Sequence, residues 1–185
     1  MHSTGASMFF FFFYLHMFRG MMYGSYRKPR ELLWLVGMAI FFVLMSLAFT
    51  GYILPWGQMS YWGAQVIVSM FGAIPVVGET LQQWLLGDFT LSDAALNRFF
   101  AYHVVTLPVI LVTLVFVHVL ALHEVGSNNP DGVEIKANKN PKTNIPVDGI
   151  PFHPYYTVKD IVGVVVFLIV FCGIIFFAPE MGGYF

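Results

Sequence analysis

Four long apolar stretches alternate with more polar connections along this chain. They cover Gly5–Tyr23, Leu32–Leu54, Phe99–Leu122 and Val158–Phe177. A helix needs ~20 mostly apolar residues to cross the hydrocarbon core of a bilayer, and all four stretches are close to or above that length. The pattern predicts an all-α membrane protein with four transmembrane helices.

The connection between the second and third stretches is interrupted too often to cross a membrane itself. Its helix-breaking residues are Pro55, Gly72, Pro75, Gly78 and Gly87. We predict two short helices there, Ser60–Phe71 and Glu79–Leu86, lying along the membrane surface. Indole rings favour the headgroup region, and three lie in this connection: Trp56, Trp62 and Trp84.

The third helix is expected to extend beyond its apolar stretch at both ends. Ser92 followed by Asp93 is typical of a helix N-terminus, and Gly126 is typical of a C-terminus. These signals predict a helix of more than ~30 residues, whose ends project past a ~30 Å hydrocarbon core. The polar connection that follows should be a loop in water.

Composition agrees with a membrane protein and excludes several other classes. Of the 185 residues 58% are hydrophobic and 10% charged, and the mean hydropathy is +0.73. Cys172 is the only cysteine, so internal disulfides and thiolate clusters are excluded. The net charge of −1 gives no basic patch for nucleic acid. The first apolar stretch lacks a basic leader, and we expect it to remain in the mature protein.

The basic residues predict an orientation. Eight lie in or beside the first and third connections: Arg19, Arg27, Lys28, Arg30, Lys136, Lys139, Lys142 and Lys159. The second connection holds Arg98 alone. By the positive-inside rule, connections 19–30 and 123–159 face the cytoplasm, and the second connection faces the opposite, positive side.

Two pairs of histidines lie in the first and third apolar stretches. His2 and His16 are fourteen residues apart, or ~21 Å along a helix, and fourteen residues complete four turns of a slightly underwound helix. His103 and His118 are fifteen apart, with Pro108 between them to bend the helix or adjust its pitch. Helices one and three run in the same direction, so His2 should share a depth with His103, and His16 with His118.

The second stretch carries two glycines at matching depths. Gly37 and Gly51 are fourteen residues apart, and in an antiparallel helix they fall level with His118 and His103. Missing side chains there would let a flat macrocycle approach the backbone. A single intramembrane histidine can be a packing residue, and paired glycines often serve helix packing alone. The agreement of both sets on two depths favours two stacked haems, each held by two imidazoles.

Several motifs resemble a known family. They are HSTGASMFFFFFYLHMFRG, GYILPWGQMSYWGA, RFFAYH, HEVGSNNP and PFHPYYTVKD, which together extend over nearly the whole chain. They resemble cytochrome b of the respiratory quinol–cytochrome c oxidoreductase, the cytochrome bc complex, in a bacterial form. The resemblance implies the family's helices B to E with an interfacial pair, in a bacterial inner membrane.

The resemblance also implies cofactors. His2 and His103 would bind the iron of a low-potential haem b near the positive side, and His16 and His118 that of a high-potential haem b near the cytoplasm. Gly37 and Gly51 would lie beside these haems. Groups around the high-potential haem's propionates would be Arg19, Ser25 and Asn128.

Two quinone sites are implied as well. Residues matching the positive-side pocket, where quinol is oxidised, are Tyr52, Met59, Gly63, Ala64 and Ile67, and those matching the cytoplasmic site, where quinone is reduced, are His123, Ser127, Lys159 and Asp160. His123 and Asp160 would supply protons, and Lys159 would stabilise negative charge on the quinone oxygen. Lys159 and Asp160 also suit an ordinary helix start at the membrane surface.

The expected partners are the Rieske iron–sulfur protein and cytochrome c-one, in a homodimeric complex with ubiquinone or a similar quinone and membrane lipid. Two alternatives stay open, a dihaem anchor subunit of another quinone-linked oxidoreductase and a haem-free proton-conducting subunit. The family's first helix should precede His2, and a Pro-Glu-Trp-Tyr motif should follow helix four, whereas Pro179–Glu180 is followed by Met181. The chain is therefore expected to be a central fragment.

The expected organisation has three parts. Residues 1–126 form the dihaem-binding transmembrane helices, with the interfacial helix pair at 57–87. Residues 127–156 form the cytoplasmic loop. Residues 157–185 form the fourth transmembrane helix and the start of the following loop.

Overall fold

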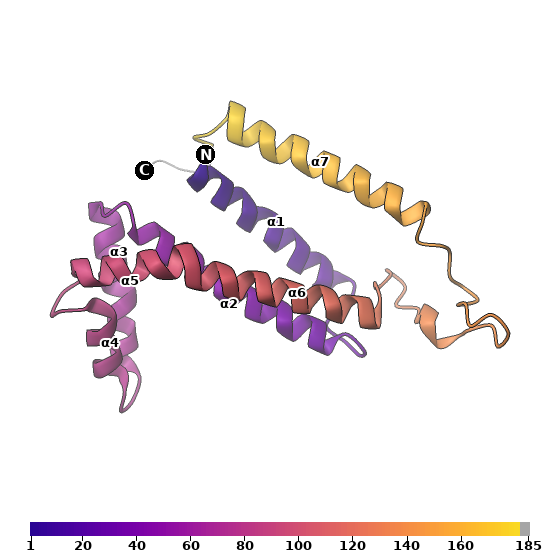
Figure 1. The fold of residues 1–185 in the computed structure, drawn as a ribbon, viewed down its shortest axis with the longest axis horizontal. Coiled ribbons are helices and arrows are strands. Elements are labelled where there is room, and N and C mark those ends of the chain that lie inside the picture. The colour runs from indigo at the N-terminus through magenta and orange to yellow at the C-terminus, as the bar shows by residue number, and fades with distance from the viewer. Residues whose placement is uncertain (182–185) are drawn as a thin grey trace. The chain divides into compact units, whose positions relative to one another are not determined.

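The computed structural model describes residues 1–181, and every regular element among them is helical (Figure 1). In chain order they are α1 His2–Met22, α2 Glu31–Ile53, α3 Gln58–Met70, η1 Phe71–Ala73, α4 Gly78–Leu86, α5 Asp93–Ala101, η2 Tyr102–Thr106, α6 Leu107–Val125, η3 Ile135–Ala137 and α7 Tyr155–Phe177. The expected all-α membrane fold is confirmed. Residues 182–185, at the end of the loop expected after helix four, lie outside the described residues.

Within residues 1–181, three helical stretches are long and apolar enough to cross a membrane. They are Glu31–Ile53, Asp93–Val125 and Tyr155–Phe177. The fourth expected span, α1, forms a helix of 21 residues, but it is not among these three. Polar residues such as His2, His16 and Arg19 lower its mean hydropathy, so its crossing of the membrane remains a prediction.

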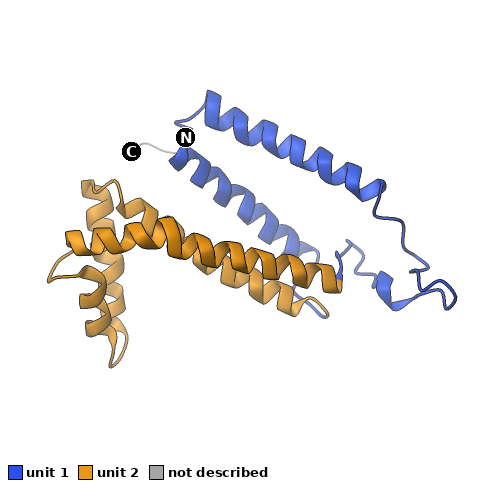
Figure 2. Ribbon diagram, in the orientation of Figure 1, with its two compact units in different colours: residues 1–28, 126–185 blue, residues 29–125 orange. Residues whose placement is uncertain are grey.

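The chain divides into two compact units, residues 29–125 and residues 1–28 with 126–185 (Figure 2). Within unit 2, which is 29–125, α2 and α6 lie side by side and antiparallel (Figure 1). The core of unit 2 is apolar and gathers residues from α2 to α5: Ile53, Ala64, Val68, Leu86, Leu91, Ala95 and Phe99.

The third long helix begins and ends where the sequence indicated, and it runs unbroken for 33 residues. Ser92 occupies the N-cap position, but its hydroxyl donates to the Leu86 carbonyl at 3.0 Å. The Asp93 carboxylate accepts from the Ala94 N–H at 2.8 Å instead. Gly126 follows the helix with a φ of +80°, a conformation that glycine adopts without steric cost.

The two short helices expected between α2 and α5 are present as α3 and α4. The α4 helix ends at Gly87, whose φ is +77°. Gln65 of α3 accepts from the Leu91 N–H at 3.0 Å and ties the end of the connection back onto α3. Trp62 and Trp84 are exposed, whereas Trp56 packs against the core of unit 2. The expected place of the three rings at the membrane surface stays a prediction.

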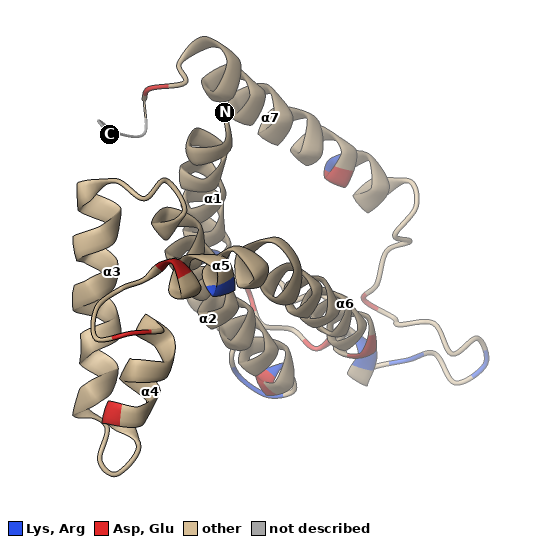
Figure 3. Ribbon diagram, turned by 60° about the vertical axis from the view of Figure 1, so that its left-hand side comes forward, with Lys and Arg blue, Asp and Glu red and all other residues tan. Residues whose placement is uncertain are grey.

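Unit 1 combines the two ends of the chain. The Phe12 ring of α1 packs edge-on against Phe167 of α7, with centroids 4.6 Å apart. The expected loop at 127–156 contains the short helix η3 and one isolated bridge between Lys139 and Pro146. Lys, Arg, Asp and Glu gather in the loops and near helix ends, and the long helices are otherwise free of charge (Figure 3).

Candidate functional site

His103 lies in η2 and directly faces a glycine of α2. A Cβ built on Gly51 would stand 2.8 Å from Nδ1 and 3.1 Å from Nε2 of His103. The ring therefore occupies the space that any other residue at position 51 would fill. This contact confirms that Gly51 and His103 share a level, as the spacing predicted.

A hydrogen bond defines the protonation of this ring. His103 Nδ1 lies 2.9 Å from the Leu47 carbonyl oxygen. A carbonyl only accepts, so Nδ1 carries the proton, and the neutral imidazole then keeps its lone pair on Nε2. Metal-binding histidines commonly donate their other ring N–H to a backbone carbonyl in this way.

His118, nearer the C-terminal end of α6, also faces a glycine of α2. A Cβ on Gly37 would lie 3.2 Å from His118 Cε1 and 3.7 Å from Nδ1. Both rings are half-buried, and both face the backbone of α2 rather than its side chains. The two imidazole rings thus cover the glycine backbone of α2 at two levels, where the sequence suggested that a flat macrocycle would approach it, and both rings remain candidate ligands for iron.

The other predicted ligands lie on α1. His2 and His16 are both within this helix and both exposed, so the intervening fourteen residues are helical throughout. They belong to unit 1, whereas His103 and His118 belong to unit 2. The pairing of the two sets therefore remains a prediction.

The structure brings together two of the three residues expected near haem propionates. The Asn128 amide donates to the Tyr23 carbonyl at 2.7 Å and lies 3.4 Å from Ser25 Oγ. Arg19 is in the last turn of α1, shortly before this contact. The loop after α6 is thus hydrogen-bonded to the turn after α1. This contact places the Asn128 amide next to the Ser25 hydroxyl.

The predicted cytoplasmic quinone residues lie on separate elements. His123 is exposed in the last turn of α6, and Ser127 lies just beyond that helix. Lys159 and Asp160 lie near the start of α7, where Lys159 Nζ is 5.4 Å from the centre of the Tyr156 ring. This cation–π contact is a structural role that the sequence did not indicate.

The predicted positive-side quinone residues lie on α2 and α3. Tyr52, Met59 and Ile67 are exposed, whereas Ala64 is 2% exposed and packs in the core of unit 2. Nothing within 4 Å would touch a Cβ on Gly63. Ala64 therefore contributes to packing in this structure, whereas Tyr52, Met59 and Ile67 remain accessible.

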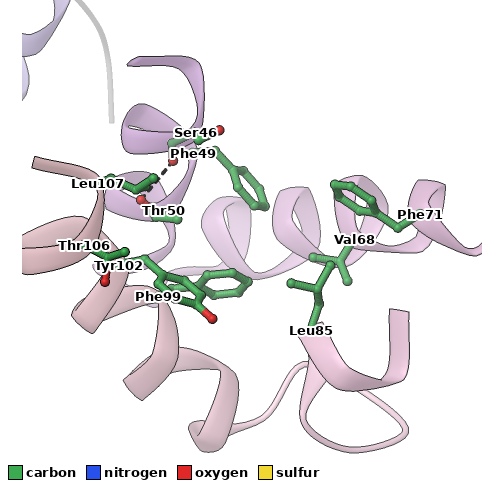
Figure 4. A pocket seen from close by; sticks show the side chains of 10 residues that line it. All are labelled: Ser46, Phe49, Thr50, Val68, Phe71, Leu85, Phe99, Tyr102, Thr106 and Leu107. Carbon is green, nitrogen blue, oxygen red and sulfur yellow. Dashed lines mark hydrogen bonds between the residues drawn. The ribbon is translucent and has the colours of Figure 1, made fainter. Parts of the chain in front are cut away.

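Unit 2 also contains an apolar cavity of about 300 Å³ (Figure 4). It is lined by Ser46, Phe49, Thr50, Val68, Phe71, Leu85, Phe99, Tyr102, Thr106 and Leu107, and none of these was singled out from the sequence. The hydroxyls of Ser46 and Thr50 donate to carbonyls of their own helix, Phe42 and Ser46, at 2.9 Å each. The wall that they form is consequently apolar.

Comparisons with known proteins extend over almost the whole chain. Residues 7–183 match the family described as Cytochrome b(N-terminal)/b6/petB. The chain is 66% identical over 190 residues to a cytochrome b of Allochromatium vinosum, spanning 100% of this chain and 45% of that protein. It is 55% identical over 183 residues to a cytochrome b of Rickettsia prowazekii, spanning 99% of this chain and 44% of that protein.

A solved structure is similar as well. A chain of a hyperthermophilic respiratory Complex III matches with a TM-score of 0.83 and 40% identity, covering 97% of this chain and 47% of that one. The chain therefore spans a little under half the length of the proteins it matches.

Proposed function

The chain belongs to the cytochrome b N-terminal family, and from this premise we propose that it carries electrons across the inner membrane within a quinol–cytochrome c oxidoreductase. Family membership makes it an integral membrane protein. It also disfavours the alternative that the chain is a dihaem anchor subunit of another oxidoreductase, because such a subunit would belong to a different family. The observation that carries the proposal is the stacking of His103 and His118 on the glycines of α2.

Four histidines would hold two b-type haems. His2 and His103 would bind the low-potential haem, and His16 and His118 the high-potential haem. When bound, the iron of each haem accepts and releases one electron. The Leu47 carbonyl accepts a hydrogen bond from His103 Nδ1, which would leave Nε2 as the nitrogen available to bind iron.

Asn128, Ser25 and Arg19 would bind the propionates of the high-potential haem. The Asn128 amide and the Ser25 hydroxyl are neutral donors, and the Arg19 guanidinium supplies a positive charge. The hydrogen bond from Asn128 to the Tyr23 carbonyl keeps these donors in position. Carboxylates would be anchored at this level without a buried, unpaired charge.

Quinone chemistry would take place at the two membrane faces. Tyr52, Met59, Gly63, Ala64 and Ile67 would form part of the site that oxidises quinol. At the cytoplasmic side, His123 and Asp160 would supply the two protons that quinone takes up, Lys159 would stabilise the oxygen's negative charge, and Ser127 would donate a hydrogen bond. The Rieske protein and cytochrome c-one would be the partners in a homodimer, because the similar solved chain is part of a respiratory complex.

A redox spectrum of the intact complex tests this proposal. Replacing His16 or His118 by Leu should remove the high-potential haem band and about half of the haem absorbance, since one of two haems would be lost. His153→Leu is the matched control, because His153 lies in the exposed loop with Thr157 as its neighbour. Survival of both bands in His118→Leu would refute the ligation, and a colourless complex would favour the haem-free alternative.

A further inference from the structure

The two histidines of the third long helix are spaced differently from the two glycines they contact. His103 and His118 are fifteen residues apart, whereas Gly37 and Gly51 are fourteen apart. Fifteen residues turn a straight α-helix through four turns plus about 60°, which would rotate one ring away from the face of the other. Both rings nevertheless lie against α2, each at its own glycine.

Phe99 and Phe100 show that the helix has taken up one extra residue. Phe100 precedes His118 by eighteen residues, which is five whole turns at about 3.6 residues per turn. In a continuous α-helix, Phe100 would therefore share the face of His118. Instead Phe100 is 56% exposed, and Phe99, one residue earlier, is 3% exposed in the core of unit 2.

The extra residue is absorbed in η2, a π-helical turn. The Leu107 N–H donates to the Tyr102 carbonyl, five residues back, where an α-helix would use the residue four back. Pro108 follows immediately. It has no N–H to donate, and in a straight helix its ring would clash with the carbonyl of Val104. A wider turn at this point relieves the clash and consumes one residue more.

We propose that Pro108 is a positioning residue for His103. By imposing the π-helical turn, it reduces the effective spacing of His103 and His118 from fifteen to fourteen and brings both rings onto the α2 face. The inference rests on the proposed haem ligation. Fourteen is also the spacing of His2 and His16 on α1. Both ligand helices then present their rings at the same separation, ~21 Å along the axis.

A double-variant cycle in the intact complex tests the inference. Pro108→Ala should straighten the helix at a spacing of fifteen, and deletion of Val112, which is 70% exposed, should leave the turn and shorten the effective spacing to thirteen. Each change alone should remove the low-potential haem signal, because a spacing of fifteen or of thirteen residues turns the His103 ring away from the face of His118. The two changes together give a straight helix with a spacing of fourteen, and the signal should return.

Two substitutions and two measurements keep the result unambiguous. Val112→Ala and Pro75→Ala, in the loop before α4, should retain both haems. Reduced-minus-oxidised spectra count the haems, and electron paramagnetic resonance of the oxidised complex reports the orientation of the axial rings. Recovery in the double variant supports the inference, because a merely structural proline would give two additive losses.

Other outcomes are equally decisive. An unchanged spectrum and resonance in Pro108→Ala would overturn the inference, and so would a double variant that assembles normally without regaining the low-potential haem. If the double variant fails to assemble while the Val112→Ala complex assembles normally, that result would also count against the inference. Absence of haem from the unaltered complex would instead refute the proposed function.

Discussion

Gly51 acts through the absence of a side chain. The backbone of α2 at this position is in contact with an imidazole ring, and a Cβ there would approach His103 Nδ1 to 2.8 Å. Gly37 is less crowded, because the nearest atom of His118 would be 3.2 Å from its Cβ. The two levels therefore differ in how much a methyl group would disturb the ring.

Gly51→Ala should accordingly be more damaging than Gly37→Ala. At Gly51 the ring must move, at a cost of about 1–3 kcal/mol for an overpacked site, and the low-potential haem signal should weaken or shift. At Gly37 a movement of a few tenths of an ångström suffices, and the high-potential signal should persist. Redox spectra of the two variants, compared at equal protein amounts, measure the difference.

Gly173→Ala is the control for these substitutions. Gly173 lies in α7, and nothing within 4 Å would meet its added Cβ. Its haem spectrum should equal that of the unaltered protein. Equal damage from all three alanines would mean that the glycines serve helix flexibility rather than space for a ring.

The histidines and glycines were recognisable from the sequence because their spacing repeats with the helical period. The hydrogen bond from His103 to the Leu47 carbonyl was not, since a backbone acceptor leaves no trace in side-chain identity. The aromatic lining of the cavity was missed for a related reason. Phe49, Phe99 and Tyr102 converge only after α2 and α5 have packed.

At the scale of elements, the helix pair α3 and α4 depends on a close backbone contact. A Cβ on Gly78, the first residue of α4, would lie 2.6 Å from the Phe71 carbonyl oxygen. Backbone atoms cannot rotate away as a side chain can. The turn between the two helices therefore requires glycine at this position.

Gly78→Ala should loosen this helix pair by about 1–3 kcal/mol. The expected result is faster cleavage of residues 71–78 in limited proteolysis of the detergent-solubilised complex. Gly57→Ala is the matched control, because Gly57 precedes α3 with open space around its Cβ. Equal cleavage rates in both variants would show that the contact does not limit opening.

The length of the apolar stretches and the helix-ending residues predicted closely where the elements begin and end. They did not predict the π-helical turn inside the third long helix. The sequence indicated that Pro108 would bend the helix or adjust its pitch. A kink and a π-helical turn are both common responses to proline, and they share one sequence signature. Packing of Phe99 into the core favours the turn over a kink, and that preference depends on residues of α3 and α4.

At the scale of the whole molecule, charge sets the predicted orientation. The first and third connections are basic, whereas the α3–α4 connection is not (Figure 3). By hydropathy alone, three helices among the described residues qualify as membrane-crossing, and the mean hydropathy of α1 is too low for it to qualify. A helix with polar positions crosses a membrane only when neighbours satisfy those positions, and the composition of one helix does not report its neighbours.

Cysteine labelling in a Cys172→Ser background tests this orientation. A membrane-impermeant maleimide should label Gln83→Cys, in α4, on intact spheroplasts, because the second connection is expected on the positive side. Lys142→Cys, in the loop after α6, should be labelled only after lysis. Both positions are exposed, so accessibility within the protein is matched. The reverse pattern would contradict the charge rule for this chain.

The contact between Asn128 and Tyr23 sets an order of events during synthesis. The two residues are 105 positions apart, so this hydrogen bond cannot form until the chain has been synthesised past the end of α6. At roughly 5–20 residues per second, the ribosome needs about 5–20 s for that length. Residues 29–125, a contiguous unit, are complete before then. The newborn protein thus passes through a stage in which α1 is complete but the residue that binds the turn after it has not yet been made.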